Sequence, residues 1–113
     1  MKLAIIGSRN FNDYFLLTKI LESYKSETTL VVSGAAKGAD SLGEKWAIEN
    51  NIKTLIFPAN WEKYGKRAGF IRNEDIIKNC DYVIAFWDGI SKGTSHSLNL
   101  AKKYNKSSKI IFI

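Results

Sequence analysis

The sequence predicts an α/β protein built as a single Rossmann-like domain over residues 1–113. Short apolar runs, typical of strands buried in a parallel sheet, alternate along the chain with segments of helical periodicity. Three of these runs lead into loops that contain glycine. A chain of 113 residues can bury one core of a sheet and its helices, but not two independent cores.

The first half of the chain is expected to supply two strands and two helices. Residues 2–6 form a continuous apolar run that predicts the first strand. Apolar residues then recur at helical spacing over residues 13–26, and residues 28–32 predict the second strand. The next helix is expected over residues 40–50, with Asp40 as its N-cap.

The middle of the chain is expected to hold a strand, a long loop and a helix. The third strand should cover residues 52–57 and end at Pro58, because proline cannot donate to a sheet ladder. Residues 59–68 are polar and predict a loop that is longer than most connections, which suggests a functional role. A third helix is expected over residues 69–79.

The last part repeats the alternation. Residues 81–87 predict a fourth strand, residues 94–105 a helix, and residues 109–113 a fifth strand. Regular alternation favours a mostly parallel sheet with helices on both faces, joined by right-handed crossovers. We expect the strand order 3-2-1-4-5, in which the first and fourth strands are central neighbours.

The composition limits the classes of function. The net charge of +6, from 17 basic and 11 acidic residues, favours anionic partners without requiring nucleic acid. One cysteine, Cys80, and one histidine, His96, leave no intramolecular disulfide, zinc site or histidine-based catalytic triad. No apolar run approaches the roughly 20 residues of a membrane span, and no signal segment precedes the first strand. We expect a cytoplasmic protein without a metal or cofactor.

Three loops are expected to converge at the carboxyl ends of the strands. They are Gly7-Ser8-Arg9, the stretch Ser33-Gly34-Ala35-Ala36-Lys37-Gly38-Ala39-Asp40, and the segment 88–94. In doubly wound sheets ligands bind at this edge, where the strand order reverses. Glycines let the backbone approach a ligand closely, and the first amides of a helix attract phosphate. The sequence therefore predicts an anion-binding crevice.

Individual side chains suggest roles in this crevice. Arg9 can contact phosphate or ribose, and Arg72 can supply a second cation. Asp40 is either a helix cap or a ribose ligand, and Asp88 is either a turn residue or a general acid or base. Trp61 can stack on a base. The expected catalytic residues are Asp88 and Arg72, and the expected ligand-binding residues are Gly7, Ser8, Arg9, Ser33, Gly34, Lys37, Gly38, Asp40, Trp61, Arg72, Asn73, Asp88, Gly93 and Thr94.

Four motifs, in this order and context, resemble the SLOG superfamily and its YspA/YpsA-related branch of small stand-alone proteins. They are Gly7-Ser8-Arg9, the stretch 33–40, Arg72-Asn73, and Trp-Asp-Gly-x-Ser-x-Gly-Thr at 87–94. The resemblance covers essentially the whole chain. It implies a Rossmann-like domain that binds a nucleotide or nucleotide-derived ligand and forms a homodimer or higher homo-oligomer.

The superfamily includes the Lonely Guy phosphoribohydrolases, and the chain departs from their motif. Gly93-Thr94 matches the Gly-Thr of Pro-Gly-Gly-x-Gly-Thr-x-x-Glu, and Arg72 matches the arginine of an Arg-Lys motif. The segment 90–92 replaces the Pro-Gly-Gly glycines, and Ser97 stands at the position of the catalytic glutamate. Without that carboxylate the motif lacks its means of stabilising an oxocarbenium-like centre.

Three functions remain open on these grounds. The leading hypothesis is a domain that senses or sequesters a nucleotide or nucleotide-derived ligand. The first alternative is an N-glycoside-cleaving enzyme that acts on nucleoside monophosphates, with Asp88 or a carboxylate from a second subunit. The second alternative is single-stranded nucleic-acid binding through the basic surface, as in a DNA-processing relative. No membrane partner is expected.

Overall fold

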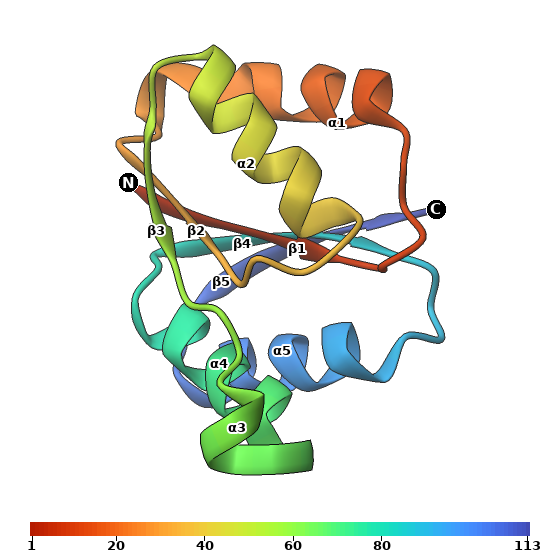
Figure 1. Cartoon of the computed structure of the whole chain (residues 1–113). Coiled ribbons are helices and arrows are strands. Elements are labelled where there is room, and N and C mark those ends of the chain that lie inside the picture. The colour runs from red at the N-terminus through yellow and green to blue at the C-terminus, as the bar shows by residue number, and fades with distance from the viewer.

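Continuous apolar segments place five parallel strands at the centre of the molecule. The computed structural model describes all residues, Met1–Ile113, and Figure 1 shows helices above and below one sheet. The order β3-β2-β1-β4-β5, with every pair parallel, confirms the predicted topology. The strands are β1 Lys2–Gly7, β2 Leu30–Ser33, β3 Lys53–Ile56, β4 Tyr82–Trp87 and β5 Ser107–Phe112.

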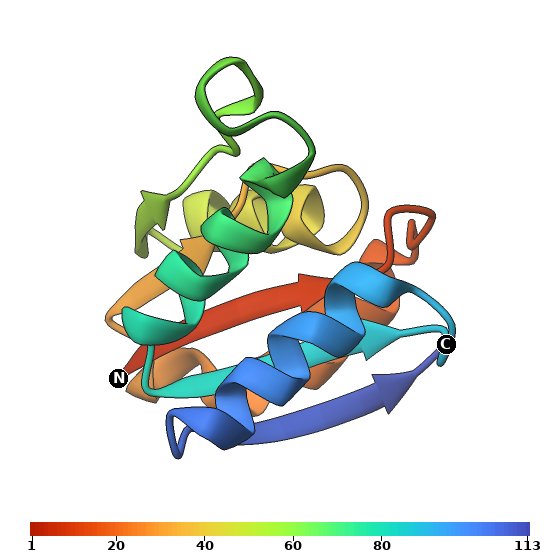
Figure 2. The ribbon, with the colours of Figure 1, turned by 90° about the horizontal axis from the view of Figure 1, so that it is seen from below.

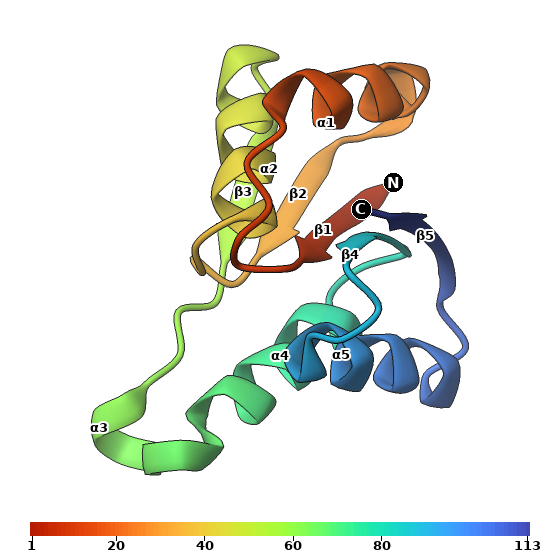
Figure 3. The same cartoon turned by 90° about the vertical axis from the view of Figure 1, so that its right-hand side faces the viewer.

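Two layers of helices cover the sheet, with α1 and α2 on one face and α4 and α5 on the other (Figure 3). Seen from below, α4 and α5 lie against the same face of the sheet (Figure 2). None of the helices is both long and apolar enough to cross a membrane. The helices are α1 Tyr14–Leu21, α2 Ala39–Glu49, α3 Trp61–Tyr64, α4 Ala68–Lys78 and α5 Lys92–Lys103, with 3₁₀ helices at Glu22–Glu27 and Gly65–Arg67.

Strand β1 supplies both halves of the core because successive side chains point to opposite faces of a sheet. Leu3 and Ile5 pack in the cluster under α1 and α2, whereas Ala4 and Ile6 pack in the cluster under α4 and α5. All four are buried. This explains why the strand reads as an unbroken apolar run, and it fixes the end of β1 between the two layers of helices.

The structure corrects three local expectations. The segment 59–68 is not a loop throughout, because Asn60 caps the short helix α3 by accepting a hydrogen bond from Lys63 N at 3.1 Å. The last helix begins at Lys92, two residues earlier than expected. Asp40 is not the N-cap of α2, since Gly38 occupies that position and Asp40 lies in the first turn.

Candidate functional site

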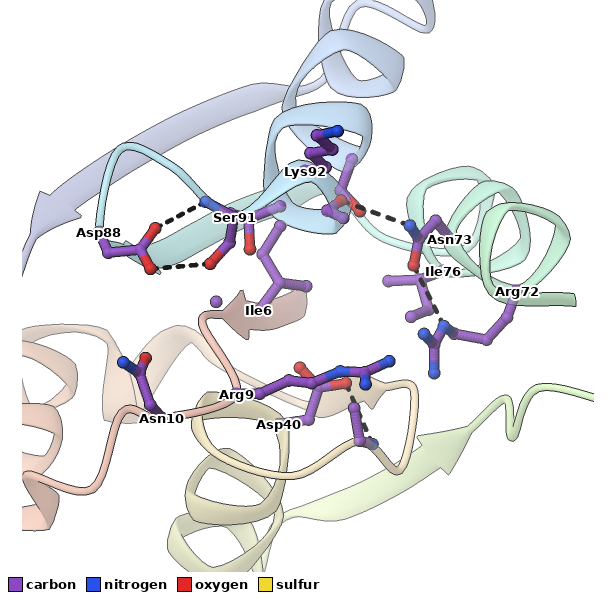
Figure 4. A pocket seen from close by; sticks show the side chains of 15 residues that line it. Ile6, Arg9, Asn10, Asp40, Arg72, Asn73, Ile76, Asp88, Ser91 and Lys92 are labelled. Atoms are coloured by element: carbon purple, nitrogen blue, oxygen red, sulfur yellow. Dashed lines mark hydrogen bonds between the residues drawn. The ribbon is translucent and has the colours of Figure 1, made fainter. Parts of the chain in front are cut away.

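A cavity of about 420 Å³ lies at the carboxyl ends of β1 and β4. The chain leaves β1 toward one face of the sheet and leaves β4 toward the other, so the crevice opens between the two connections. Figure 4 shows the residues around it. They come from the end of β1 and the loop after it, the loop before α2 and its first turn, one side of α4, and the loop after β4 with the start of α5. They are Ile6, Gly7, Arg9, Asn10, Ala36, Asp40, Arg72, Asn73, Ile76, Asp88, Ser91, Lys92, Gly93, Thr94 and Ser97.

The start of α5 forms one wall of the cavity and leaves backbone donors available. Asp88 Oδ1 accepts hydrogen bonds from the amides of Ile90 at 2.8 Å and Ser91 at 2.7 Å. The next three amides, of residues 92–94, have no acceptor within the chain, and the helical ladder begins when Ser95 N donates to Ser91 O. Unsatisfied amides in the first turn of a helix carry partial positive charge and bind anions.

Asp88 and Ser8 build this wall and offer little to a ligand. In addition to the two amides, the carboxylate of Asp88 accepts from Ser91 Oγ at 2.9 Å, and these hydrogen bonds lower its pKa to about 2. A carboxyl group with this pKa is ionised at neutral pH and is a poor general acid. Ser8 is buried outside the cavity lining, where its Oγ accepts from Asp88 N at 3.1 Å.

Two guanidinium groups line the cavity without a carboxylate partner. The only salt bridge in the structure joins Lys78 and Glu74 of α4, and neither residue lines the cavity. Arg72 donates from Nη1 to Gly34 O at 2.8 Å, and Arg9 makes no hydrogen bond within the chain. Burial lowers the pKa of Arg72; the charge of Asp40 opposes this shift and the charge of Arg9 adds to it. Two cations held near each other, neither of them in a salt bridge, favour an anionic ligand.

Asn73 connects α4 to the start of α5. Its Oδ1 accepts from Arg72 Nε at 3.1 Å, and its Nδ2 donates to Gly93 O at 3.4 Å. The side chain is buried, and its Nδ2 also lies 3.3 Å from His96 Nδ1. Asn73 therefore orients a cation and holds one end of the helix whose amides face the cavity.

Asp40 reaches the cavity from the opposite side, with only 6% of the residue exposed. Its Oδ2 accepts from Gly34 N at 3.1 Å and from Ala36 N at 3.4 Å, so the carboxylate fixes the shape of the loop before α2. Burial raises the pKa of Asp40 to about 6, although the charge of Arg72 opposes the shift. Of the carboxyl groups at this cavity, Asp40 is the one that can change its protonation near neutral pH.

A second cavity of about 360 Å³ adjoins the first, and Arg9, Ala36 and Arg72 line both. Lys37 and Trp61 line only this second cavity, and 53% of Trp61 is exposed. The predicted base-stacking residue therefore lies beside the anion-binding cavity and not inside it.

Two other predicted residues, Ser33 and Gly38, lie behind these surfaces. Ser33 is fully buried, and its Oγ donates to Glu44 Oε2 at 2.6 Å. Gly38 adopts a φ of 78°, and a Cβ there would lie 2.6 Å from Arg9 O. It therefore allows the loop before α2 to pass close to the loop after β1. Gly34 lines only the second cavity.

Sequence reasoning did not assign Asn10, Ser91 or Lys92 to the site, although each lines the cavity. Asn10 directly follows the Gly-Ser-Arg motif, and the other two belong to the segment between β4 and the expected helix. The available signals were the position of Asn10 next to a motif and the position of Ser91 and Lys92 inside the motif at 87–94. No group of three or more His, Cys, Asp or Glu side chains is placed to hold a metal ion.

Known proteins resemble this chain in sequence and in fold. The sequence model of the YspA, cpYpsA-related SLOG family matches residues 1–64. The Gene 61 protein of Mycobacterium phage D29 is 34% identical over 111 aligned residues, covering 90% of this chain and 89% of that protein.

Two solved structures share the fold. DNA processing protein A of Streptococcus pneumoniae superimposes with a TM-score of 0.78 and 22% identity over 96% of this chain. DNA processing protein A of Helicobacter pylori, whose structure describes a single-stranded DNA binding mode, gives 0.70 and 21% over 97%. The chain spans 49% and 64% of the lengths of these two structures.

Proposed function

The chain belongs to the YspA, cpYpsA-related SLOG family, and from the geometry of its cavity we propose that it binds a nucleotide or nucleotide-derived ligand and acts as a sensing or sequestering domain. The observation that carries this proposal is the pairing of unbonded amides at residues 92–94 with the unpaired guanidinium groups of Arg9 and Arg72 in one cavity. Amides and arginines converging on one site suit a phosphate group.

The dimensions and surroundings of the cavity fit a ligand larger than phosphate. Small-molecule sites enclose roughly 300–1,000 Å³, and the volume of about 420 Å³ lies within this range. The adjoining cavity adds Trp61, a half-exposed aromatic surface, beyond Arg9 and Arg72. A nucleotide with its phosphate in the first cavity and its planar base near Trp61 would occupy both cavities.

The side chains of the cavity favour binding of the ligand without catalysis. Asp88 is held in its turn by three hydrogen bonds and has a pKa of about 2, and Ser97 makes no hydrogen bond to a base. Neither residue is arranged as a general acid or an activated nucleophile.

The replacement Arg9→Ala tests the proposal because the Arg9 guanidinium makes no hydrogen bond or salt bridge within the chain. Its loss should weaken binding of a nucleoside phosphate by about tenfold to a hundredfold, the usual contribution of a hydrogen bond to a charged group. Calorimetric titration with nucleoside mono-, di- and triphosphates measures the effect.

Arg67→Ala is the matched control, since Arg67 is an exposed arginine outside both cavities. Its affinity should equal that of the unsubstituted protein. Failure of every nucleotide in the panel to bind, or equal loss in the two variants, would count against the proposal.

A second candidate function is single-stranded DNA binding. The net charge of +6 and the exposed Trp61 and Tyr64 favour it, and the Helicobacter pylori structure describes this activity for a protein of the same fold. Backbone contacts by basic residues make such binding steeply salt-dependent. Fluorescence anisotropy of a labelled oligonucleotide at increasing salt would detect it, and a mononucleotide should compete poorly.

A further inference from the structure

Asp40 leaves one carboxylate oxygen without a partner in the cavity. Both amides that it binds, of Gly34 and Ala36, donate to Oδ2, and no group of the chain donates to Oδ1. No fully buried side-chain oxygen or nitrogen of the protein lacks a hydrogen bond, so Oδ1 is not sealed inside the fold. Figure 4 shows Asp40 across the cavity from Ser91 and Lys92.

A carboxylate oxygen at this place constrains the chemistry of a ligand. It repels a phosphate and accepts hydrogen bonds from hydroxyl or amino groups. The opposite wall, at residues 92–94, offers donors to an anion. A ligand that satisfies both walls carries an anionic group at one end and a hydrogen-bond donor a short distance away.

The sugar of a nucleotide is the part placed to meet Asp40. It is joined directly to the phosphate, so a phosphate bound at residues 92–94 keeps the sugar within or beside the same cavity. The lining of that cavity contains no aromatic side chain, and its apolar members are Ile6, Ala36 and Ile76. The aromatic surface of Trp61 belongs to the adjoining cavity, which suits a base better.

We infer that Asp40 accepts a hydrogen bond from a ribose hydroxyl of the ligand and makes the site selective for ribonucleotides over their deoxy counterparts. This inference rests on the proposed function, because it assumes a nucleotide in the cavity. It also separates the ligand from single-stranded DNA, whose internal sugars have no free hydroxyl to donate.

Titration calorimetry on the full chain tests the selectivity directly. The probes are the four ribonucleoside 5′-monophosphates with their 2′-deoxy and 2′,3′-dideoxy counterparts. Loss of a hydrogen bond to a buried charged group should weaken binding by about tenfold to a hundredfold for the base that binds best. Equal affinities of the ribo, 2′-deoxy and 2′,3′-dideoxy forms of each base would overturn the inference and leave the proposed function standing, whereas absence of binding by all probes would overturn both.

The variant Asp40→Asn assigns the selectivity to its residue. The amide keeps an oxygen for Gly34 N and removes the charge, so the preference for the ribose should fall to a few-fold while phosphate-dependent binding persists. Glu44→Gln is the matched control, one turn further along α2 and bound to Ser33 outside the cavity. A preference retained in Asp40→Asn would show that another group reads the hydroxyl. If the variant does not fold, the comparison of probes on the unsubstituted protein still tests the selectivity.

Discussion

At the scale of single residues, Asp40 combines a structural role with an unfavourable burial of its charge. Its carboxylate holds the loop before α2 through Gly34 N and Ala36 N, yet burial disfavours its charge. Arg72 offsets part of that cost without forming a salt bridge to it. A ligand hydroxyl on the free oxygen would compensate further.

The pH dependence of stability follows from this conflict. Burial raises the pKa of Asp40 from 3.8 to about 6. Between these values the folded protein keeps a proton that the unfolded chain has released, so the contribution of Asp40 to the free energy of unfolding falls as the pH rises and levels off above about pH 6. In Asp40→Asn this titration is absent. The stability of the variant relative to the unsubstituted protein should therefore rise by about 2 kcal/mol from pH 4 to pH 7.

Urea denaturation of both proteins across this range measures the difference, in which the titration of other carboxyl groups cancels. A relative stability that is flat with pH, or that falls as the pH rises, would show that the carboxylate is not desolvated as the structure indicates.

Roles of individual site residues were only partly predictable from the sequence. Arg9 and Arg72 could be selected because planar cations beside glycine-containing loops suit anions. From the sequence alone, the hydroxyls of Ser8 and Ser33 are equally suitable ligands for an anion. In the fold they are buried, and Ser33 donates to Glu44, which is 11 residues away in sequence. Such partners are determined by packing, not by local pattern.

At the scale of elements, Gly34 allows α4 to contact the loop before α2. A Cβ at this position would lie 2.6 Å from Arg72 Cδ, so the absence of a side chain lets Arg72 cross the loop and donate to Gly34 O. This contact and the hydrogen bond of Asn73 to Gly93 O join three segments around the cavity. These hydrogen bonds join the motif at 33–40, Arg72-Asn73 and the motif at 87–94 around one cavity.

Gly34→Ala should displace Arg72 and weaken nucleotide binding several-fold, while the fold persists because the collision is with a flexible side chain. Calorimetry measures the affinity for the nucleotide, and circular dichroism shows whether the fold is retained. Gly69→Ala is the control: its Cβ would make only ordinary contacts with Trp61 and Arg72, and alanine is favoured over glycine in α4. It should leave affinity unchanged and leave stability equal or higher. Equal affinities in the two variants would remove Arg72 from the binding site.

The elements themselves were predictable to within a few residues, with the segment 59–68 as the main exception. Apolar runs and helical periodicity located all five strands and four of the helices. The short helix α3 was missed because four residues contain too little periodicity to register, and its cap, Asn60, is equally common in turns. The start of α5 was also displaced, since Lys92 and Gly93 give no strong N-terminal signal.

At the scale of the whole molecule, the sheet order creates the site. Strands β1 and β4 are neighbours, and their chains leave to opposite faces, so loops from distant parts of the sequence meet at one edge. Alternation of strands and helices was sufficient to predict this topology and the position of the crevice. It could not reveal that the crevice divides into two cavities separated by Arg9 and Arg72, because that depends on side-chain directions.

The most direct test of the central claim is the position of a bound nucleotide phosphate. Backbone amide chemical shifts of the labelled protein can be followed by NMR during titration with a ribonucleoside 5′-monophosphate. The account predicts that the largest changes occur at residues 92–94, with further changes at Arg9 and around Asp40. Saturable binding that leaves the amides of residues 92–94 unchanged, or that shifts only surface lysines away from the cavity, would contradict it.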